Sequence, residues 1–106
     1  MALLIKNPHV YSPDDLGIKD VLVVNDKVAA VGENLQVCVP ELETLDAKGM
    51  ILTPGFIDQH IHVNGGGGEG GPQTRTPEIM LSELIECGTT SLVGVSGTDS
   101  VTRSIE

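Results

Sequence analysis

The sequence is poor in large aromatic side chains and in positive charge. Its 106 residues include one Phe, one Tyr and no Trp, and six Lys or Arg stand against fifteen Asp or Glu, which gives a formal net charge of −9. Binding to nucleic acid or to an anionic membrane surface requires clustered Lys and Arg, so we expect neither partner. A chain of this length suffices for one small domain or for part of a larger protein.

The sequence also lacks a long hydrophobic run and a cysteine cluster. The apolar part of "MALLIKNPHV" is too short for a signal peptide, and no stretch approaches the ~18 apolar residues of a membrane span. We therefore expect a soluble, cytoplasmic protein. Cys38 and Cys87 do not have the spacing of a metal site, and we expect buried thiols in a reducing compartment rather than a disulfide.

The first half of the chain, residues 1–53, predicts a small all-β unit. "ALLIKNPHVY" predicts a strand that is broken near Pro8. "DVLVVNDKVAAVG" predicts a hairpin, because Asn25 and Asp26 tolerate the positive φ of a type I′ turn. "LQVCVP" and "LETLDAKGMILTP" supply further strand-like segments.

The second half, residues 54–106, changes to a pattern of strand, loop, helix and strand. "FIDQHIHV" and "TTSLVGVSGT" predict strands, and "TPEIMLSELIECG" predicts a helix with Thr76 as N-cap and Gly88 just beyond its end. This order predicts a βαβ unit with parallel strands and a right-handed crossover. Because such a unit leaves bare sheet edges, we interpret it as the start of a barrel that is truncated in this chain.

The first of these strands carries a His-x-His motif. Since residues i and i+2 of a strand share a face, one face is predicted to hold Phe56, Asp58, His60 and His62 and the other Ile57, Gln59, Ile61 and Val63.

Imidazoles in a barrel interior are costly unless they are hydrogen-bonded or bound to metal. The two histidines can share one ion, with zinc favoured and other divalent ions possible. Asp58 could orient a histidine ring or brace the strand end. A coincidental motif is the alternative, but barrel enzymes carry their active sites at this end of a strand.

A glycine-rich segment, "NGGGGEGG", follows directly and matches neither a Walker loop nor a dinucleotide fingerprint. It is either a flexible connector or a loop whose backbone approaches a ligand closely. In the second case Glu69 is expected to contact substrate, for instance an ammonium group, rather than metal. Thr98 and Asp99 follow the second strand and could reach the same pocket, although Asp99 or Ser100 can instead cap a following helix.

These strings resemble a known family. "MILTPGFIDQHIH" resembles the signature of the amidohydrolase superfamily, whose members join a small β-sandwich to a (β/α)8 barrel, and "DVLVVNDKVAAVG" resembles its sandwich strands. "GFIDQHIHVNGGGGEGGPQTRTPE" resembles the isoaspartyl dipeptidase family within it, since dihydroorotases and hydantoinases share His-x-His without the polyglycine-glutamate loop. The resemblance implies an α/β fold, with sandwich strands in residues 1–53 and the first βαβ unit of the barrel in residues 54–106.

The resemblance also implies an activity, the metal-dependent hydrolysis of β-aspartyl dipeptides at a site with two zinc ions. His60 and His62 would bind the more buried ion. The substrate pocket would include Gly67, Gly68, Glu69 and Thr98, with Glu69 receiving the α-ammonium group. The catalytic aspartate, the carboxylated lysine and the remaining histidines of the family have no counterpart in this chain, so we expect no catalytic residue here and no activity from the chain alone.

Two alternatives stay open at this stage. One is another amidohydrolase, of the dihydroorotase, hydantoinase or deacetylase type, and the other is a non-catalytic protein with an amidohydrolase-like fold. For the full-length enzyme we expect a small dipeptide substrate and a homo-oligomeric assembly.

Overall fold

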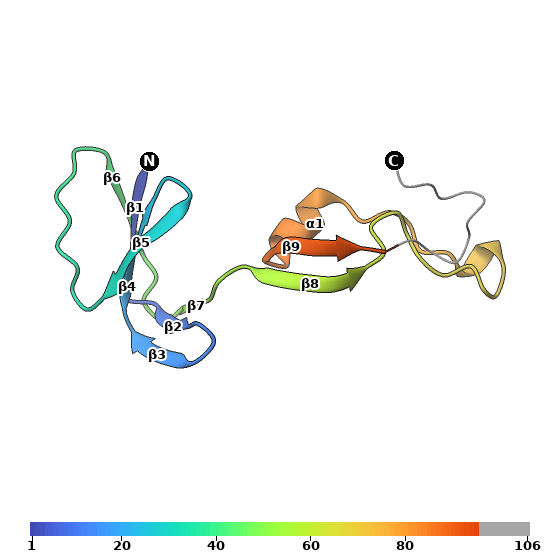
Figure 1. The fold of residues 1–106 in the computed structure, drawn as a ribbon, viewed down its shortest axis with the longest axis horizontal. Coiled ribbons are helices and arrows are strands. Elements are labelled where there is room, and N and C mark those ends of the chain that lie inside the picture. Colours follow the sequence, from blue (N-terminus) through green and yellow to red (C-terminus); the bar gives the residue numbers. More distant parts are fainter. Residues whose placement is uncertain (96–106) are drawn as a thin grey trace. The chain divides into compact units, whose positions relative to one another are not determined.

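The computed structural model describes residues 1–95. They form two compact units, Met1–Pro54 and a second unit that begins at Gly55. The first consists of strands, and the second contains two strands, one α-helix and one 3-10 helix (Figure 1). The assignment of residues 1–53 and 54–106 as separate domains stays a prediction.

The first unit consists of two sheets. The four-stranded sheet has the order β5-β4-β1-β6 and the three-stranded sheet the order β3-β2-β7. The strands are β1 (Ala2–Lys6), β2 (His9–Tyr11), β3 (Asp15–Ile18), β4 (Asp20–Val24), β5 (Lys27–Gly32), β6 (Leu42–Asp46) and β7 (Ile51–Leu52). Side chains from both sheets, among them Ile5, Val10 and Leu52, line one cavity of about 290 Å³. The unit is a small β-sandwich, as predicted.

Local sequence signals placed several of these elements correctly. The chain breaks at Pro8 between β1 and β2, and β4 and β5 form the predicted hairpin. Asn25 has a φ of 54°, but Asp26 is not among the described residues with positive φ. Since a type I′ turn needs positive φ at both central residues, that part of the prediction is wrong. The ladder also shifts register beside the turn, between Leu22 and Val23.

The prediction of a strand at "LQVCVP" is wrong, because no strand lies between β5 and β6. The backbone N–H of Leu35 donates to Oδ2 of the buried Asp20 at 3.0 Å rather than to a neighbouring strand. Val37 and Val39 line a cavity together with side chains of β4. The alternating apolar residues of this segment therefore line a cavity beside the sheet without joining its ladder.

The cysteines also differ from expectation. Cys38 and Cys87 are free thiols, as predicted, but both are exposed rather than buried. Cys38 lies on the outward side of the segment that carries Val37 and Val39, and Cys87 is the C-cap of the α-helix. Apolar neighbours in the sequence therefore did not indicate burial at either position.

The second unit is the predicted βαβ unit. Strand β8 (Phe56–Ile61) pairs in parallel with β9 (Thr89–Gly94), and helix α1 (Leu81–Glu86) lies between them in the chain. Gly88, with a φ of 75°, follows the C-cap residue as predicted. The predicted N-cap is wrong: Met80 holds that position, and its backbone N–H donates to Oε2 of Glu83 at 2.8 Å. Thr76 forms different hydrogen bonds, which are described below.

The second unit leaves most of its apolar side chains exposed. Ile57 on β8 and both Leu81 and Ile85 on α1 are exposed, whereas Leu84 is half-buried. One βαβ unit cannot cover both faces of a parallel pair, so this exposure fits the start of a barrel. Within residues 1–95, no helix has the length and apolar character needed to cross a membrane.

Candidate metal and substrate site

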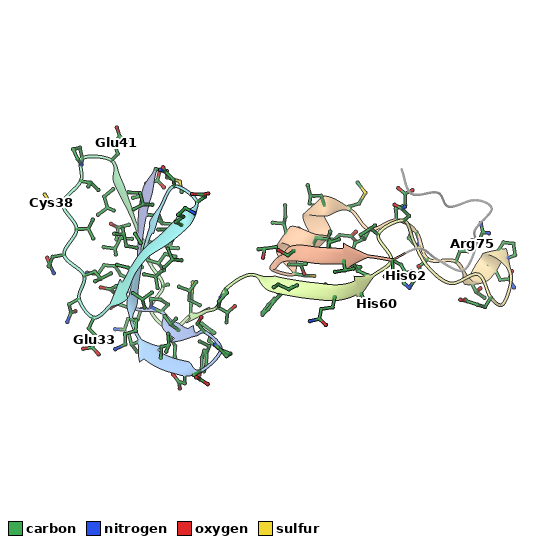
Figure 2. The ribbon with its side chains drawn as sticks, in the orientation of Figure 1. Glu33, Cys38, Glu41, His60, His62 and Arg75 are labelled. Atoms are coloured by element: carbon green, nitrogen blue, oxygen red, sulfur yellow. The ribbon has the colours of Figure 1, made fainter. Side chains whose placement is uncertain are left out.

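His60 and His62 lie side by side at the end of β8 (Figure 2). His60 belongs to the strand, but His62 follows its last residue, Ile61, so the predicted strand is too long at this end. The two imidazole rings still lie next to each other in an edge-to-face arrangement, with centroids 5.3 Å apart and ring planes at 82°. The chain thus brings the two predicted ligands together.

The separation of the two rings fits a shared metal ion. With Zn–N bonds of about 2.1 Å and ring nitrogens about 1.2 Å from the centroid, two imidazoles on one tetrahedral ion have centroids about 5 Å apart. The observed value is 5.3 Å. In addition, Nδ1 of His62 is buried without a hydrogen-bond partner, which is costly for an imidazole that binds nothing. The two side chains therefore suit a divalent ion that prefers nitrogen ligands.

Two histidines do not complete a metal site, because structural and catalytic zinc sites have at least three protein ligands. Among residues 1–95, no group of three or more His, Cys, Asp or Glu side chains could hold an ion. Asp58 does not complete such a group, and its Oδ1 accepts a hydrogen bond from the backbone N–H of His60 at 3.0 Å. Of the two roles predicted for Asp58, this contact corresponds to bracing the strand end.

The glycine-rich segment after His62 is hydrogen-bonded to the segment that returns from it. The backbone N–H of Gly66 donates to Oγ1 of Thr76 at 2.8 Å, and the N–H of Thr76 donates to the carbonyl of Gly66 at 2.9 Å. Three residues further on, the N–H of Ile79 donates to the carbonyl of Val63 at 3.1 Å. The segment is a loop with its own hydrogen bonds and not an unstructured connector.

The return segment also explains why glycine is needed at two of these positions. Gly65 has a φ of 82°, and a Cβ there would overlap the carbonyl oxygen of Thr76. Gly67 has a φ of 73°, and a Cβ there would lie 2.5 Å from the carbonyl oxygen of Thr74. Residues other than glycine rarely adopt such φ values. Any other residue would therefore be strained both by its backbone conformation and by the contact of its Cβ with the carbonyl oxygen. The glycines allow two backbone segments of this chain to approach each other.

The predicted substrate residues occupy the outer part of this loop. Gly67 and Gly68 are half-buried and Glu69 is exposed. A Cβ on Gly68 would lie 3.3 Å from Cγ and Nε of Arg75, so the arginine side chain lies against the backbone of Gly68. The remaining candidates, Thr98 and Asp99, lie outside the described residues. The role of this set in substrate binding stays a prediction.

The third histidine, His9, lies in the sandwich unit. Its Nε2 is 2.6 Å from Oδ1 of Asp15, and its ring stacks on Tyr11 with centroids 4.7 Å apart. The hydrogen bond from His9, together with one from the backbone N–H of Gly17, holds the pKa of Asp15 below its ordinary value of 3.8. These contacts explain His9 as a structural residue of the sheet formed by β2 and β3.

Comparisons with known proteins find hydrolases with the same fold. No protein-family model matches the sequence. D-hydantoinase from a Thermus species is 27% identical over 87% of this chain and 20% of its own, with a TM-score of 0.66. A dihydroorotase from Aquifex aeolicus (strain VF5) is 42% identical over 90 residues, which are 83% of this chain and 18% of that protein. The neighbours are amidohydrolases with a (β/α)8 barrel, and the chain has the small β-sandwich and the start of such a barrel.

Within this class, the chain is similar to one enzyme over nearly its whole length. The beta-aspartyl dipeptidase of Fervidobacterium islandicum AW-1 is 50% identical over 99% of this chain, with a TM-score of 0.87. The predicted resemblance to the isoaspartyl dipeptidases of the amidohydrolase superfamily is therefore confirmed. The chain spans 29% of that dipeptidase and 18% of the dihydroorotase.

Proposed function

We propose that the complete protein carrying this chain is a metal-dependent hydrolase of β-aspartyl (isoaspartyl) dipeptides. The observation that carries the proposal is the 50% identity over 99% of the chain to a beta-aspartyl dipeptidase, an enzyme also solved in complex with the beta-Asp-Leu dipeptide. Cytoplasmic location and homo-oligomeric assembly of the complete protein belong to the same proposal.

His60 and His62 are the proposed ligands of the more buried of two zinc ions. Their ring separation of 5.3 Å and the unpartnered Nδ1 of His62 support this role. When bound, such ions polarise the scissile carbonyl and lower the pKa of a water molecule. Asp58 contributes by fixing the backbone of His60 at the strand end, through the 3.0 Å bond to its N–H.

The glycine-rich loop is the proposed recognition element for the dipeptide. Glu69 is exposed in this loop, where its carboxylate can accept charge-assisted hydrogen bonds from the free α-ammonium group of the substrate. The other proposed contacts are Gly67, Gly68 and Thr98. Since the remaining metal ligands and the catalytic aspartate of the family have no counterpart in this chain, residues 1–106 alone are expected to be inactive.

A second candidate function is favoured by the curated relatives. The similarity to dihydroorotase, at 42% identity over 83% of the chain, would equally suit an enzyme that opens a cyclic amide. The two functions differ in what the loop must recognise. A β-aspartyl dipeptide presents a free ammonium group to Glu69, whereas a cyclic amide does not.

The test is a substrate comparison with the complete protein. Beta-Asp-Leu, alpha-Asp-Leu, dihydroorotate and a hydantoin are supplied in parallel, and zinc is measured by elemental analysis. We expect hydrolysis of beta-Asp-Leu alone and two zinc ions per subunit. Turnover of dihydroorotate without beta-Asp-Leu would favour the second candidate, and turnover of none of the four would favour a non-catalytic protein.

A further inference from the structure

We infer that Thr76 is a positioning residue for the metal ligand His62 and that it acts through Gly66. The inference rests on the proposed metal site and extends it to a side chain that has no proposed contact with the ion or the substrate. Three observations carry it: the contact of Thr76 with Gly66, the contact of Gly66 with His62, and the surroundings of the His62 ring.

The first contact is a clamp on the backbone of Gly66. Oγ1 of Thr76 accepts the N–H of Gly66 at 2.8 Å, and the N–H of Thr76 donates to the carbonyl of Gly66 at 2.9 Å. One residue therefore satisfies both backbone groups of a glycine that is itself buried. Because buried backbone groups require partners, removing the hydroxyl would leave the N–H of Gly66 without its acceptor.

The second contact joins Gly66 to the metal ligand. A Cβ on Gly66 would lie 3.2 Å from Cγ and 3.4 Å from Cδ2 of His62, so the glycine backbone lies against the imidazole ring. The N–H of Gly65 also donates to the carbonyl of His62 at 3.0 Å. The position of the ring is thus coupled to the path of the loop that Thr76 holds.

The third observation concerns the ring itself. A histidine that binds metal needs a fixed ring orientation, which neighbouring groups supply. Nδ1 of His62, the atom left available to the ion, is buried and has no hydrogen-bond partner within the described residues, so no hydrogen bond at this atom holds the ring. Packing against Gly66 fixes the ring instead, and a change that frees Gly66 also frees the ring.

The experiment compares three variants of the complete protein. Thr76→Val keeps the shape of the side chain and removes the hydroxyl, and Thr76→Ser keeps the hydroxyl. Thr74→Val is the matched control, since Oγ1 of Thr74 donates to the carbonyl of Gly71 at 2.8 Å in the same loop and forms no hydrogen bond with Gly66. The readouts are zinc affinity by chelator competition and the rate of trypsin cleavage after Arg75, which adjoins the clamp.

We expect Thr76→Val to weaken zinc binding by about tenfold, the lower end of the effect of residues that support metal ligands, and to accelerate cleavage after Arg75. Thr76→Ser should restore both values, and Thr74→Val should leave zinc affinity unchanged. Equal zinc affinity in Thr76→Val and the unmodified protein would overturn the inference, as would an equal loss in Thr76→Val and Thr74→Val.

A second variant covers the case in which Thr76→Val does not fold. Gly66→Ala keeps the hydroxyl and places a methyl group against the ring of His62, so zinc affinity should fall without faster cleavage after Arg75. Unchanged affinity in this variant overturns the inference. The unmodified protein separates the two proposals: bound zinc without hydrolysis of beta-Asp-Leu contradicts the proposed substrate alone, whereas absence of zinc contradicts both.

Discussion

The two units of the chain differ in what holds them together. In the sandwich unit, Leu4, Val10 and Val21 are 4–5% exposed, whereas Ile57 and Leu81 of the second unit are 68% and 71% exposed. The first unit buries a core of its own. The second unit is held together by one pair of parallel strands and by the hydrogen bonds of the loop beside His62. Changes in the first unit should therefore affect stability, and changes in the second should affect metal and substrate binding.

The largest effect is expected where the second unit carries the metal ligands. His60→Ala or His62→Ala in the complete protein should lower zinc affinity by more than about 100-fold, because loss of a direct ligand exceeds the 10–100-fold effect of its supporting residues. Hydrolysis of beta-Asp-Leu should fall with it. Elemental analysis and steady-state kinetics provide the measurement, and His9→Ala is the control. Full zinc content in both variants would contradict the assignment of these ligands.

The converse effect is expected for the core of the first unit. Leu4→Ala should lower the free energy of unfolding by about 2–5 kcal/mol, since it removes a buried aliphatic side chain, and should leave zinc affinity unchanged. Urea unfolding and chelator competition measure the two quantities. Leu45, which is 51% exposed on the neighbouring strand, provides the control variant Leu45→Ala with a smaller loss. Weakened zinc binding in Leu4→Ala would show that the two units are energetically coupled.

A matched pair of glycines tests the two units at the same backbone geometry. Gly49 in the first unit and Gly65 in the second both have a φ of 82°, but only Gly65 would bring a Cβ onto another backbone atom. Gly49→Ala should cost about 1–2 kcal/mol, the penalty for a left-handed non-glycine residue. Gly65→Ala should carry the same penalty and should also displace the loop, which is detected as faster trypsin cleavage after Arg75 and weaker zinc binding. Equal behaviour of the two variants would mean that the loop adapts without strain.

The sequence predicts elements whose signals are local. Pro8 ends a strand by its missing N–H, Asn25 permits a tight hairpin, and Gly88 accepts the left-handed conformation after a helix. The His-x-His motif and the glycines could be recognised as a candidate site for the same reason. Each depends on residues within a few positions of one another.

The remaining features depend on partners that are distant in the chain. Thr76 before a proline has the local signature of an N-cap, yet its hydroxyl binds Gly66, ten residues earlier. Alternation at Val37 and Val39 fits the two side chains that line a cavity, but it does not indicate whether the backbone pairs with a strand. A signal for Thr76 did exist in the glycines, since a run that needs positive φ implies a neighbouring backbone at close approach.

The smallest effect is expected from acid titration in the first unit. Hydrogen bonds from His9 and Gly17 hold the pKa of Asp15 below its ordinary value of 3.8. A carboxyl with a lowered pKa in the folded state stabilises that state above the unfolded pKa, and this contribution is lost as the pH falls from about 3.8 through the lower folded value. Asp15→Asn should therefore reduce the loss of stability on acidification, measured by urea unfolding on either side of this range. Asp14→Asn is the control, because it removes the same charge at the adjacent position. Its loss of stability on acidification should be larger than that of Asp15→Asn. Identical acid sensitivity of the two variants would show that the contact with His9 contributes nothing to stability.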